Sequence, residues 1–179
     1  MHRLNLVEPD KAEPEAKALL DAIQRKMGLT PNIMRAMANS PAVLRAYSEF
    51  SGALAEGALP ARLREQIALQ VAELNECGYC LAAHSVIAKQ AGLSQAEIVA
   101  SRRGKGTGPR EDAALVFART LVERKGDVTD ADVEALREAG FSDGEIAEIT
   151  ANVVLNILTN YINHVAKTPI DFPRADPLP

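Results

Sequence analysis

With 179 residues, 47% of them hydrophobic, and a formal net charge of −4, the chain suits one domain with a sizeable hydrophobic core. Acidic and basic residues are mixed along it without a basic block, so its charge gives no reason to expect binding to nucleic acid or to an anionic membrane. No apolar run approaches transmembrane length and the first residues lack the pattern of a secretory signal, which predicts a cytoplasmic protein.

The first part of the chain predicts an N-terminal arm and three helices. Residues 1–28 form the arm and a first helix, whose apolar side chains repeat at helical spacing and whose stop signal is Gly28. A short helix follows Pro31, and Ser40 is placed to cap the next helix over residues 42–55. The residues expected on the buried side of that third helix are Val43, Leu44, Tyr47, Phe50 and Leu54.

Two further helices are predicted on either side of Cys77, the first of the two cysteines. Residues 61–74 carry an apolar stripe beside a stripe of small, nearly uncharged side chains that also contains Glu65. The second helix holds Cys80 in its first turn and ends before Gly92, which supplies the left-handed backbone that a helix terminus often needs. If these two helices pack antiparallel, Glu65 faces the cysteine helix.

The second half of the chain also predicts helices, and the expected segments are 94–99, 109–125, 130–139 and 143–167. The glycine-rich segment 102–108 lacks the preceding strand and the spacing of a phosphate-binding loop, so we expect an exposed connection there. A Gly-apolar-Ser-x-x-Glu-Ile pattern occurs at residues 92–98 and again at 140–146, which is consistent with an internal duplication of a helical unit. No useful stretch alternates with period two, so the predicted fold class is all-α.

The last helix is apolar over more than one face, which suggests burial against its own bundle and against a partner subunit. Its four asparagines lie on one stripe, where they could hydrogen-bond within a subunit contact: Asn152, Asn156, Asn160 and Asn163. We therefore expect a homo-oligomer. For His164, packing at the helix end and a place near the active site of its own or a neighbouring subunit are equally weighted interpretations.

The Cys77-x-x-Cys80-x-x-x-His84 pattern predicts redox chemistry. The N–H groups of the helix start favour a thiolate there, and Cys77 is close enough to Cys80 for a disulfide. His84, one turn beyond Cys80, shares its face and can hydrogen-bond its sulfur, and a buried Glu65 could relay a proton. The alternatives are a structural zinc site, for which four ligands are not evident, and inert thiols.

These residues resemble the signature of a known family. Glu65, eleven intervening residues and then the cysteine–histidine pattern look like the carboxymuconolactone decarboxylase/AhpD family of alkylhydroperoxidase-like proteins. Leu59-Pro60, Gly92-Leu93-Ser94 and the segments 160–166 and 170–173 are similar to its peroxidase-related branch. The resemblance covers residues 29–173 and implies a single AhpD-like helical domain over 1–179, with 168–179 as an extended tail, assembled into trimers or hexamers.

The resemblance also implies roles for individual residues. Cys80 would be the peroxidatic cysteine, Cys77 the resolving cysteine, His84 a contact of the Cys80 sulfur, and Glu65 a general base or proton relay. Tyr79 stands where AhpD proper has a histidine, and it does not titrate near neutral pH, so we expect it to be a wall of the site.

The implied function is that of a thiol-dependent peroxidase, which reduces a hydroperoxide through a dithiol/disulfide cycle. No flavin or nicotinamide fingerprint is visible, so we expect no cofactor and no metal. An external dithiol, or a lipoyl or thioredoxin-like protein, would then reopen the disulfide.

Two other functions stay open. A lactone decarboxylase-like enzyme would act on a small carboxylated ring without using the cysteines, but no obvious arginine cluster is present to bind carboxylates. A non-enzymatic redox-sensing module would change its oligomeric state when the disulfide forms and would not turn over peroxide.

Overall fold

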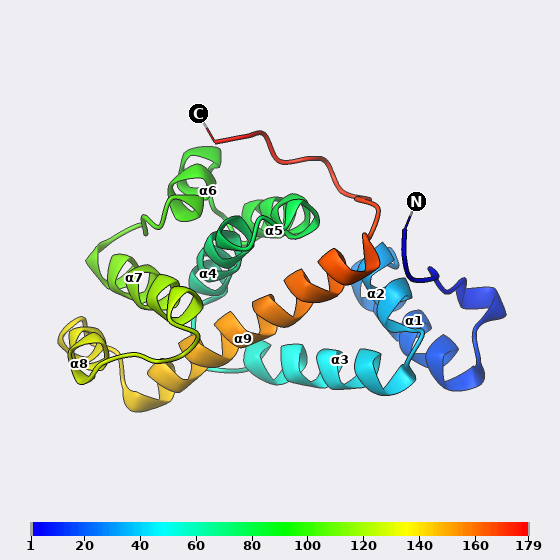
Figure 1. The fold of residues 1–179 in the computed structure, drawn as a ribbon, viewed down its shortest axis with the longest axis horizontal. Helices are drawn as coiled ribbons and strands as arrows, with labels where there is room; N and C mark the ends of the chain where they lie inside the picture. The colour runs from blue at the N-terminus through cyan, green and yellow to red at the C-terminus, as the bar shows by residue number, and fades with distance from the viewer. Residues whose placement is uncertain (1, 179) are drawn as a thin grey trace.

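The computed structural model describes residues 2–178, and helices are the only regular secondary structure found there (Figure 1). The predicted all-α fold class is therefore confirmed. The elements in chain order are η1 (Pro9–Lys11), α1 (Pro14–Met27), α2 (Asn32–Met37), α3 (Pro41–Ala55), α4 (Ala61–Leu74), α5 (Gly78–Gln90), α6 (Gln95–Arg102), α7 (Pro109–Glu123), α8 (Asp130–Glu138) and α9 (Asp143–Ala166). Within the described residues, none of these helices is both long and apolar enough to cross a membrane.

Helix α4 is the central element of the fold. It packs against α5, α6, α7 and α9, and every residue from Gln66 to Ala72 is buried. Ile67 joins the main core with α7 and α9, Leu69 joins a small cluster with α5 and α6, and Ala72 packs in the cluster that contains the cysteines. Burial of each large aliphatic side chain contributes about 1.5–3 kcal/mol to the stability of the fold. Packing on α4 therefore holds the neighbouring helices in place.

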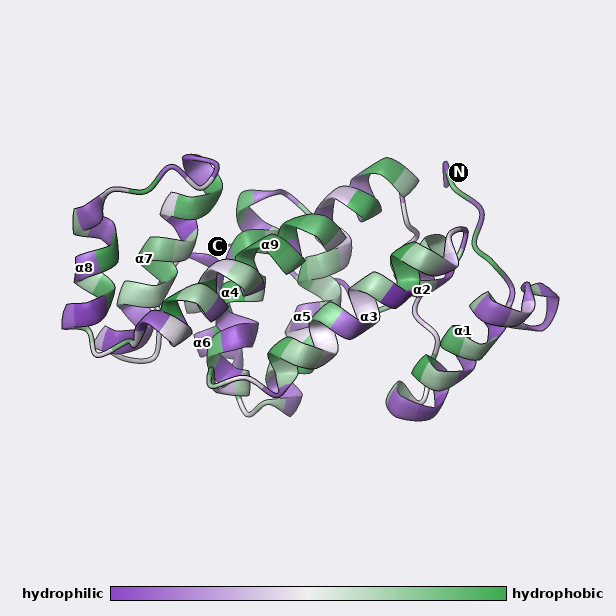
Figure 2. Cartoon of the chain, turned by 90° about the horizontal axis from the view of Figure 1, so that it is seen from below, coloured by the Kyte–Doolittle hydropathy of each residue, from purple (hydrophilic) through white to green (hydrophobic). Residues whose placement is uncertain are grey.

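Helix α9 crosses the whole molecule and contacts α2, α3, α4, α5 and α7 (Figure 1). Figure 2 shows hydrophobic residues along α9 in the middle of the molecule, whereas α8 and the ends of α1 carry hydrophilic residues. After α9 the chain runs as a tail without helix, past α5 towards α6 (Figure 1). The tail is fastened to α6 because Arg102 donates a hydrogen bond to the carbonyl oxygen of Asp176 (2.8 Å).

Two turns form as their matching sequence patterns predict. Gly92 and Gly140 both take left-handed backbone conformations, with φ of 88° and 85°, which is costly for any residue except glycine. Complete capping boxes follow at Ser94 and Ser142, which start α6 and α9. Local hydrogen bonds therefore define both of these helix starts.

The predicted buried side of α3 is wrong at Val43, which is 40% exposed. Among the helix residues only Leu44 is fully buried, in the cluster that contains the cysteines. Helix α3 lies at an edge of the fold and packs on α1, α2 and α9, so its apolar stripe is wider than the surface available to cover it.

The four asparagines of α9 are buried inside the chain, so the prediction that they lie on a subunit contact is wrong. The side chains of Asn152 and Asn156 donate to backbone carbonyl oxygens one turn earlier, both at 2.8 Å. Asn160, which is fully buried, accepts a hydrogen bond from the side chain of Asn75 (2.8 Å). Their spacing places them on the inner face of α9, where polar side chains need partners.

A different face of α9 is exposed and apolar. It consists of Val154, Leu158, Tyr161 and Val165, each more than a third exposed.

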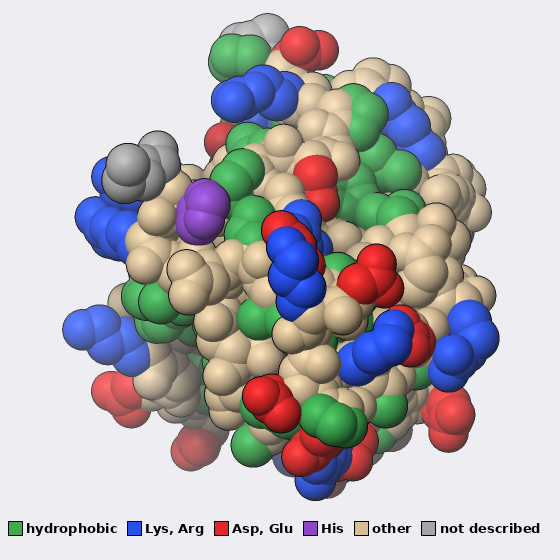
Figure 3. All heavy atoms as spheres, turned by 90° about the vertical axis from the view of Figure 1, so that its right-hand side faces the viewer, with side chains coloured by type: hydrophobic (Ala, Val, Ile, Leu, Met, Phe, Trp, Pro, Cys, Tyr) green, Lys and Arg blue, Asp and Glu red, His purple; other side chains and the backbone are tan. Residues whose placement is uncertain are grey.

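The surface at the end of the molecule near α1 and α2 has a different character, because it carries scattered charges of both signs between hydrophobic side chains (Figure 3). The homo-oligomer remains a prediction. The exposed apolar face of α9 is the part of this helix that a partner subunit could contact.

Helix α4 buries two glutamines at the centre of the fold. Gln66 and Gln70 are completely inaccessible, and their amide nitrogen and oxygen atoms have no hydrogen-bond partner among the described residues. A buried polar group that is left unpaired costs about 1–3 kcal/mol. These two side chains therefore lower the stability of the protein.

We predict that Gln66→Met, which keeps the length of the side chain and removes its polar atoms, raises the free energy of unfolding by about 1 kcal/mol. The measurement is urea unfolding followed by circular dichroism. Gln90→Met, at an exposed position at the end of α5, is the control and should change stability by less than about 0.5 kcal/mol. A clear loss of stability in Gln66→Met would contradict the prediction.

Candidate functional site

The site begins at the turn between α4 and α5. The amide of Cys77 donates to the carbonyl oxygen of Ala72 (2.8 Å), and Glu76 takes a left-handed conformation with φ of 53°. This hydrogen bond closes the end of α4 in the manner of a Schellman motif. The chain therefore reverses within a few residues, and α5 starts beside α4.

Cys77 and Cys80 form a disulfide at the first turn of α5, with their Cα atoms 5.3 Å apart. Cys77 is the N-cap residue, and its sulfur accepts a hydrogen bond from the backbone N–H of Cys80 (3.3 Å). Both residues are buried, with exposed fractions of 1% and 3%. The N–H groups of a helix start favour negative charge on a sulfur, which assists opening of the disulfide to thiolates.

Glu65 and His84 meet across the interface between α4 and α5. A carboxylate oxygen of Glu65 lies 2.8 Å from Nδ1 of His84, and both side chains are largely buried. The inward position that the sequence predicts for Glu65 is thus the one observed. The expected hydrogen bond from His84 to the Cys80 sulfur is not among those formed by the described residues; His84 bonds to Glu65 through Nδ1.

The donor to the Cys80 sulfur is instead Asn163 of α9. Its Nδ2 lies 3.3 Å from Sγ of Cys80, and the residue is 5% exposed. Its Oδ1 is buried and has no hydrogen-bond partner among the described residues. In the sequence, Asn163 is recognisable only as one of the asparagines that share a face of α9. Their spacing does not show which helix this face contacts.

Tyr79 is held on both sides by other segments of the chain. Its hydroxyl accepts a hydrogen bond from the backbone N–H of Ile33 (3.2 Å), and its ring packs edge-on against Phe172 of the tail, with centroids 5.8 Å apart. Burial first, and a hydrogen bond to Asp171 second, raise the pKa of the Tyr79 phenol far above its ordinary value. Tyr79 is a fixed wall of the site.

A cavity of about 390 Å³ opens in front of Cys80. Its apolar lining comes from α1, α2, α3, α5 and the tail, and includes Ile23, Met27, Ile33, Met34, Ala83, Ile87 and Phe172. Its polar lining includes Glu65, His84 and Asn163, and also Tyr47, whose phenol pKa is raised, chiefly by burial. Cys80 lines this cavity and Cys77 does not, so a small molecule in the cavity would meet Cys80 first.

His164 lies outside this cavity lining. Its Nε2 is 2.8 Å from the carbonyl oxygen of Asn75, and its side chain is exposed. His164 thus ties α9 to the end of α4, as in the helix-end interpretation. Its proximity to the site of a neighbouring subunit stays a prediction.

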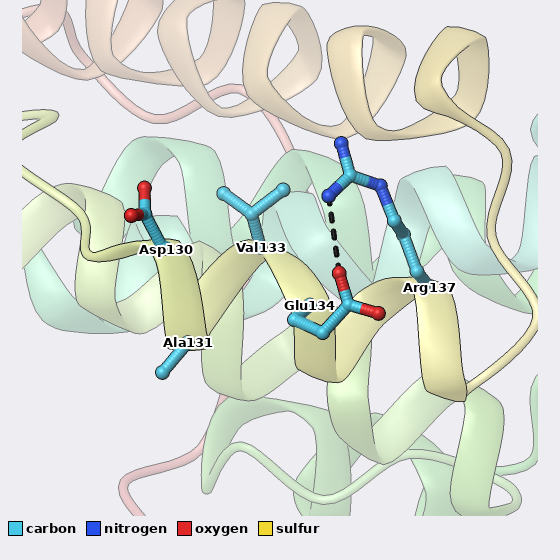
Figure 4. Close-up of a pocket in the computed structure, with 5 residues that line it drawn as sticks. All are labelled: Asp130, Ala131, Val133, Glu134 and Arg137. Carbon is cyan, nitrogen blue, oxygen red and sulfur yellow. Dashed lines mark hydrogen bonds and ion pairs between the residues drawn. The ribbon is translucent and has the colours of Figure 1, made fainter.

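A second hollow lies on α8, remote from the cysteines in sequence, and is lined by Asp130, Ala131, Val133, Glu134 and Arg137 (Figure 4). Glu134 and Arg137 form an ion pair there at 3.1 Å, and about half of each side chain is exposed. The hollow contains no cysteine or histidine and is a surface depression along one helix. Among the described residues, no three His, Cys, Asp or Glu side chains are grouped as around a metal ion.

The fold and the site define an all-helical protein with a Cys-x-x-Cys disulfide at a helix start, opposed by a glutamate–histidine pair. Residues 41–123 match the Carboxymuconolactone decarboxylase family, and this confirms the resemblance seen in the sequence. The fold is also similar to that of solved peroxidase-related structures. No curated protein sequence matches the chain.

Solved structures share this fold over nearly the whole chain. The alkylhydroperoxidase AhpD core of an uncharacterized peroxidase-related protein from Ralstonia eutropha JMP134 is 26% identical, with a TM-score of 0.86 over 95% of this chain and 92% of that one. An uncharacterized peroxidase-related protein from Silicibacter sp. TM1040 is 26% identical, with a TM-score of 0.80 over 93% and 88%. The debrominase Bmp8, at 20% identity, shares the fold with a TM-score of 0.75 over 88% and 87%.

The raised pKa of Tyr79 predicts a loss of stability at high pH. The neutral phenol is favoured by folding, so its contribution is complete below the ordinary tyrosine pKa of about 10 and is lost as pH rises above it. Between about pH 10 and 12, Tyr79→Phe should make the fall in the free energy of unfolding shallower by up to about 1.4 kcal/mol per pH unit. The measurement is urea unfolding at several pH values.

The matched control for this experiment is Tyr161→Phe, because Tyr161 is 57% exposed on the outer face of α9. It should leave the dependence of stability on pH as in the wild type. Equal slopes for wild type and Tyr79→Phe would contradict the prediction.

Proposed function

We propose that the protein is a thiol-dependent peroxidase, which reduces a hydroperoxide through a cycle between the Cys77/Cys80 dithiol and its disulfide. The observation that carries the proposal is a redox-active pair at a helix start whose second sulfur alone lines a largely apolar cavity. The family match and the peroxidase-related solved neighbours support the same class of chemistry.

In the first step the Cys80 thiolate attacks the terminal oxygen of the hydroperoxide. An S–O bond forms, the O–O bond breaks, and the leaving alkoxide takes a proton to become an alcohol. The Glu65–His84 pair lines the same cavity and is hydrogen-bonded at 2.8 Å, so it is the group placed to supply that proton. Cys80 is thereby oxidised to a sulfenic acid.

In the second step the Cys77 thiolate attacks the Cys80 sulfur. The S–S bond forms, and the sulfenic hydroxyl leaves as water after it takes a proton. An external dithiol, either a small molecule or a lipoyl or thioredoxin-like protein, then supplies two electrons and reopens the disulfide. Both sulfurs are buried, so the reductant has to reach Cys80 through the cavity.

A lactone decarboxylase-like reaction has less support. A carboxylated ring would need cationic partners, and the cavity lining in the described part of the chain contains one cationic side chain, Lys26, and no arginine. The largely apolar lining favours an organic hydroperoxide, whose alkyl or aryl group would pack there.

The first test is the reaction of reduced protein with cumene hydroperoxide in the presence of dithiothreitol. Cys80→Ser should abolish consumption of the hydroperoxide. Cys77→Ser, reduced and then freed of dithiothreitol before the hydroperoxide is added, should stop with a sulfenic acid on Cys80, detected by mass spectrometry after trapping with dimedone. Equal turnover by wild type and Cys80→Ser would refute the proposal.

The second test concerns the proton supply. Glu65→Gln keeps the shape of the side chain and removes its charge, so it should lower kcat/KM for the hydroperoxide by about 100-fold or more. Glu76→Gln, at an exposed position in the turn before Cys77, is the control and should keep the wild-type value. An unchanged kcat/KM in Glu65→Gln would remove this residue from the mechanism.

A further inference from the structure

Asn163 contacts the Cys80 sulfur with the nitrogen of its side-chain amide. Its Nδ2 is 3.3 Å from the sulfur, and the residue lines the cavity and is 95% buried. A hydrogen bond in such surroundings is electrostatically stronger than one in water.

The N–H of this amide acts on the sulfur. A disulfide sulfur is a weak acceptor, whereas a thiolate accepts a shorter and stronger, charge-assisted hydrogen bond. A hydrogen bond that is stronger to the charged form favours that form. Asn163 is therefore placed to stabilise a Cys80 thiolate through its side-chain N–H.

Asn163 is held firmly beside the Cys80 sulfur. Its backbone oxygen accepts hydrogen bonds from the amides of Lys167 and Thr168 at the end of α9. One turn of the same helix is tied to the α4–α5 turn through Asn75, which binds Asn160 by its side chain and His164 by its carbonyl oxygen. The position of α9 relative to the cysteines is thus fixed next to Asn163.

We propose that Asn163 is a catalytic residue, whose Nδ2 donates to the Cys80 thiolate that attacks the hydroperoxide. This inference rests on the proposed function. As the sulfur–oxygen bond forms and the O–O bond breaks, the terminal hydroxyl stays on sulfur as the sulfenic acid, and the alkoxide receives its proton from the Glu65–His84 pair. Asn163 itself neither gains nor loses a proton.

The test uses Cys77→Ser, in which Cys80 is the single thiol, with and without Asn163→Leu. The titratable groups around this thiol are Lys26 of α1, Tyr47 of α3, Glu65 of α4, and Tyr79 and His84 of α5, and all of them are kept. The first measurement is the rate of Cys80 alkylation by iodoacetamide against pH. Asn163→Leu should raise the pKa of the thiol by about one, because a charge-assisted hydrogen bond is lost.

The second measurement is the rate of reaction with cumene hydroperoxide against pH. Its midpoint should rise in Asn163→Leu by the same amount, because the same thiolate attacks both reagents. Asn156→Leu, a buried asparagine of α9 that bonds only within the helix, is the control and should leave both profiles unchanged. Asn163→Ala serves if Asn163→Leu does not fold.

An unchanged thiol pKa in Asn163→Leu would overturn the role of Asn163. If Cys77→Ser itself fails to react with cumene hydroperoxide, the proposed function fails. The alkylation profile would still decide whether Asn163 stabilises the thiolate.

Discussion

The hydrogen bond from the Cys77 amide to the carbonyl oxygen of Ala72 (2.8 Å) determines where the cysteines lie. It closes the end of α4 at a left-handed Glu76, so that α5 returns along α4 from its first residue. Because α4 is packed on four other helices, α5 has a fixed position as soon as this turn forms. The contact of Glu65 with His84 follows directly, since both residues lie on the facing sides of the two helices.

The second constraint is the polar contact of α9 with this turn. Asn75 binds Asn160 and His164, and Asn163 reaches Cys80 one turn further along. Asn160 and Asn163 are buried, where a hydrogen bond is electrostatically stronger than in water and an unpaired group is costly. These polar contacts therefore help to specify the register of α9 beside the cysteines.

Local signals made much of this structure predictable from the sequence. The capping boxes at Ser94 and Ser142 and the cysteine pair at a helix start depend on residues within one turn of each other. The position of Glu65 needed one further assumption, antiparallel packing. Asn163 was missed because it is 83 positions from Cys80, and periodicity shows which residues share a face but not what that face meets. Val43 was misplaced for the same reason, since the edge position of α3 is a property of the whole fold.

The two tyrosines at the site, Tyr79 and Tyr47, are not proton donors near neutral pH. Burial and Asp171 keep the Tyr79 phenol protonated, and burial does the same for Tyr47, so neither exchanges a proton near neutral pH. In the proposed reaction the alkoxide therefore depends on Glu65 and His84, which line the cavity together. The nucleophile and the leaving group are then served by different helices, since α9 supplies Asn163 to the sulfur while α4 and α5 supply the proton. Loss of either set should slow the same step for a different reason, because one changes the population of thiolate and the other the stability of the departing oxygen.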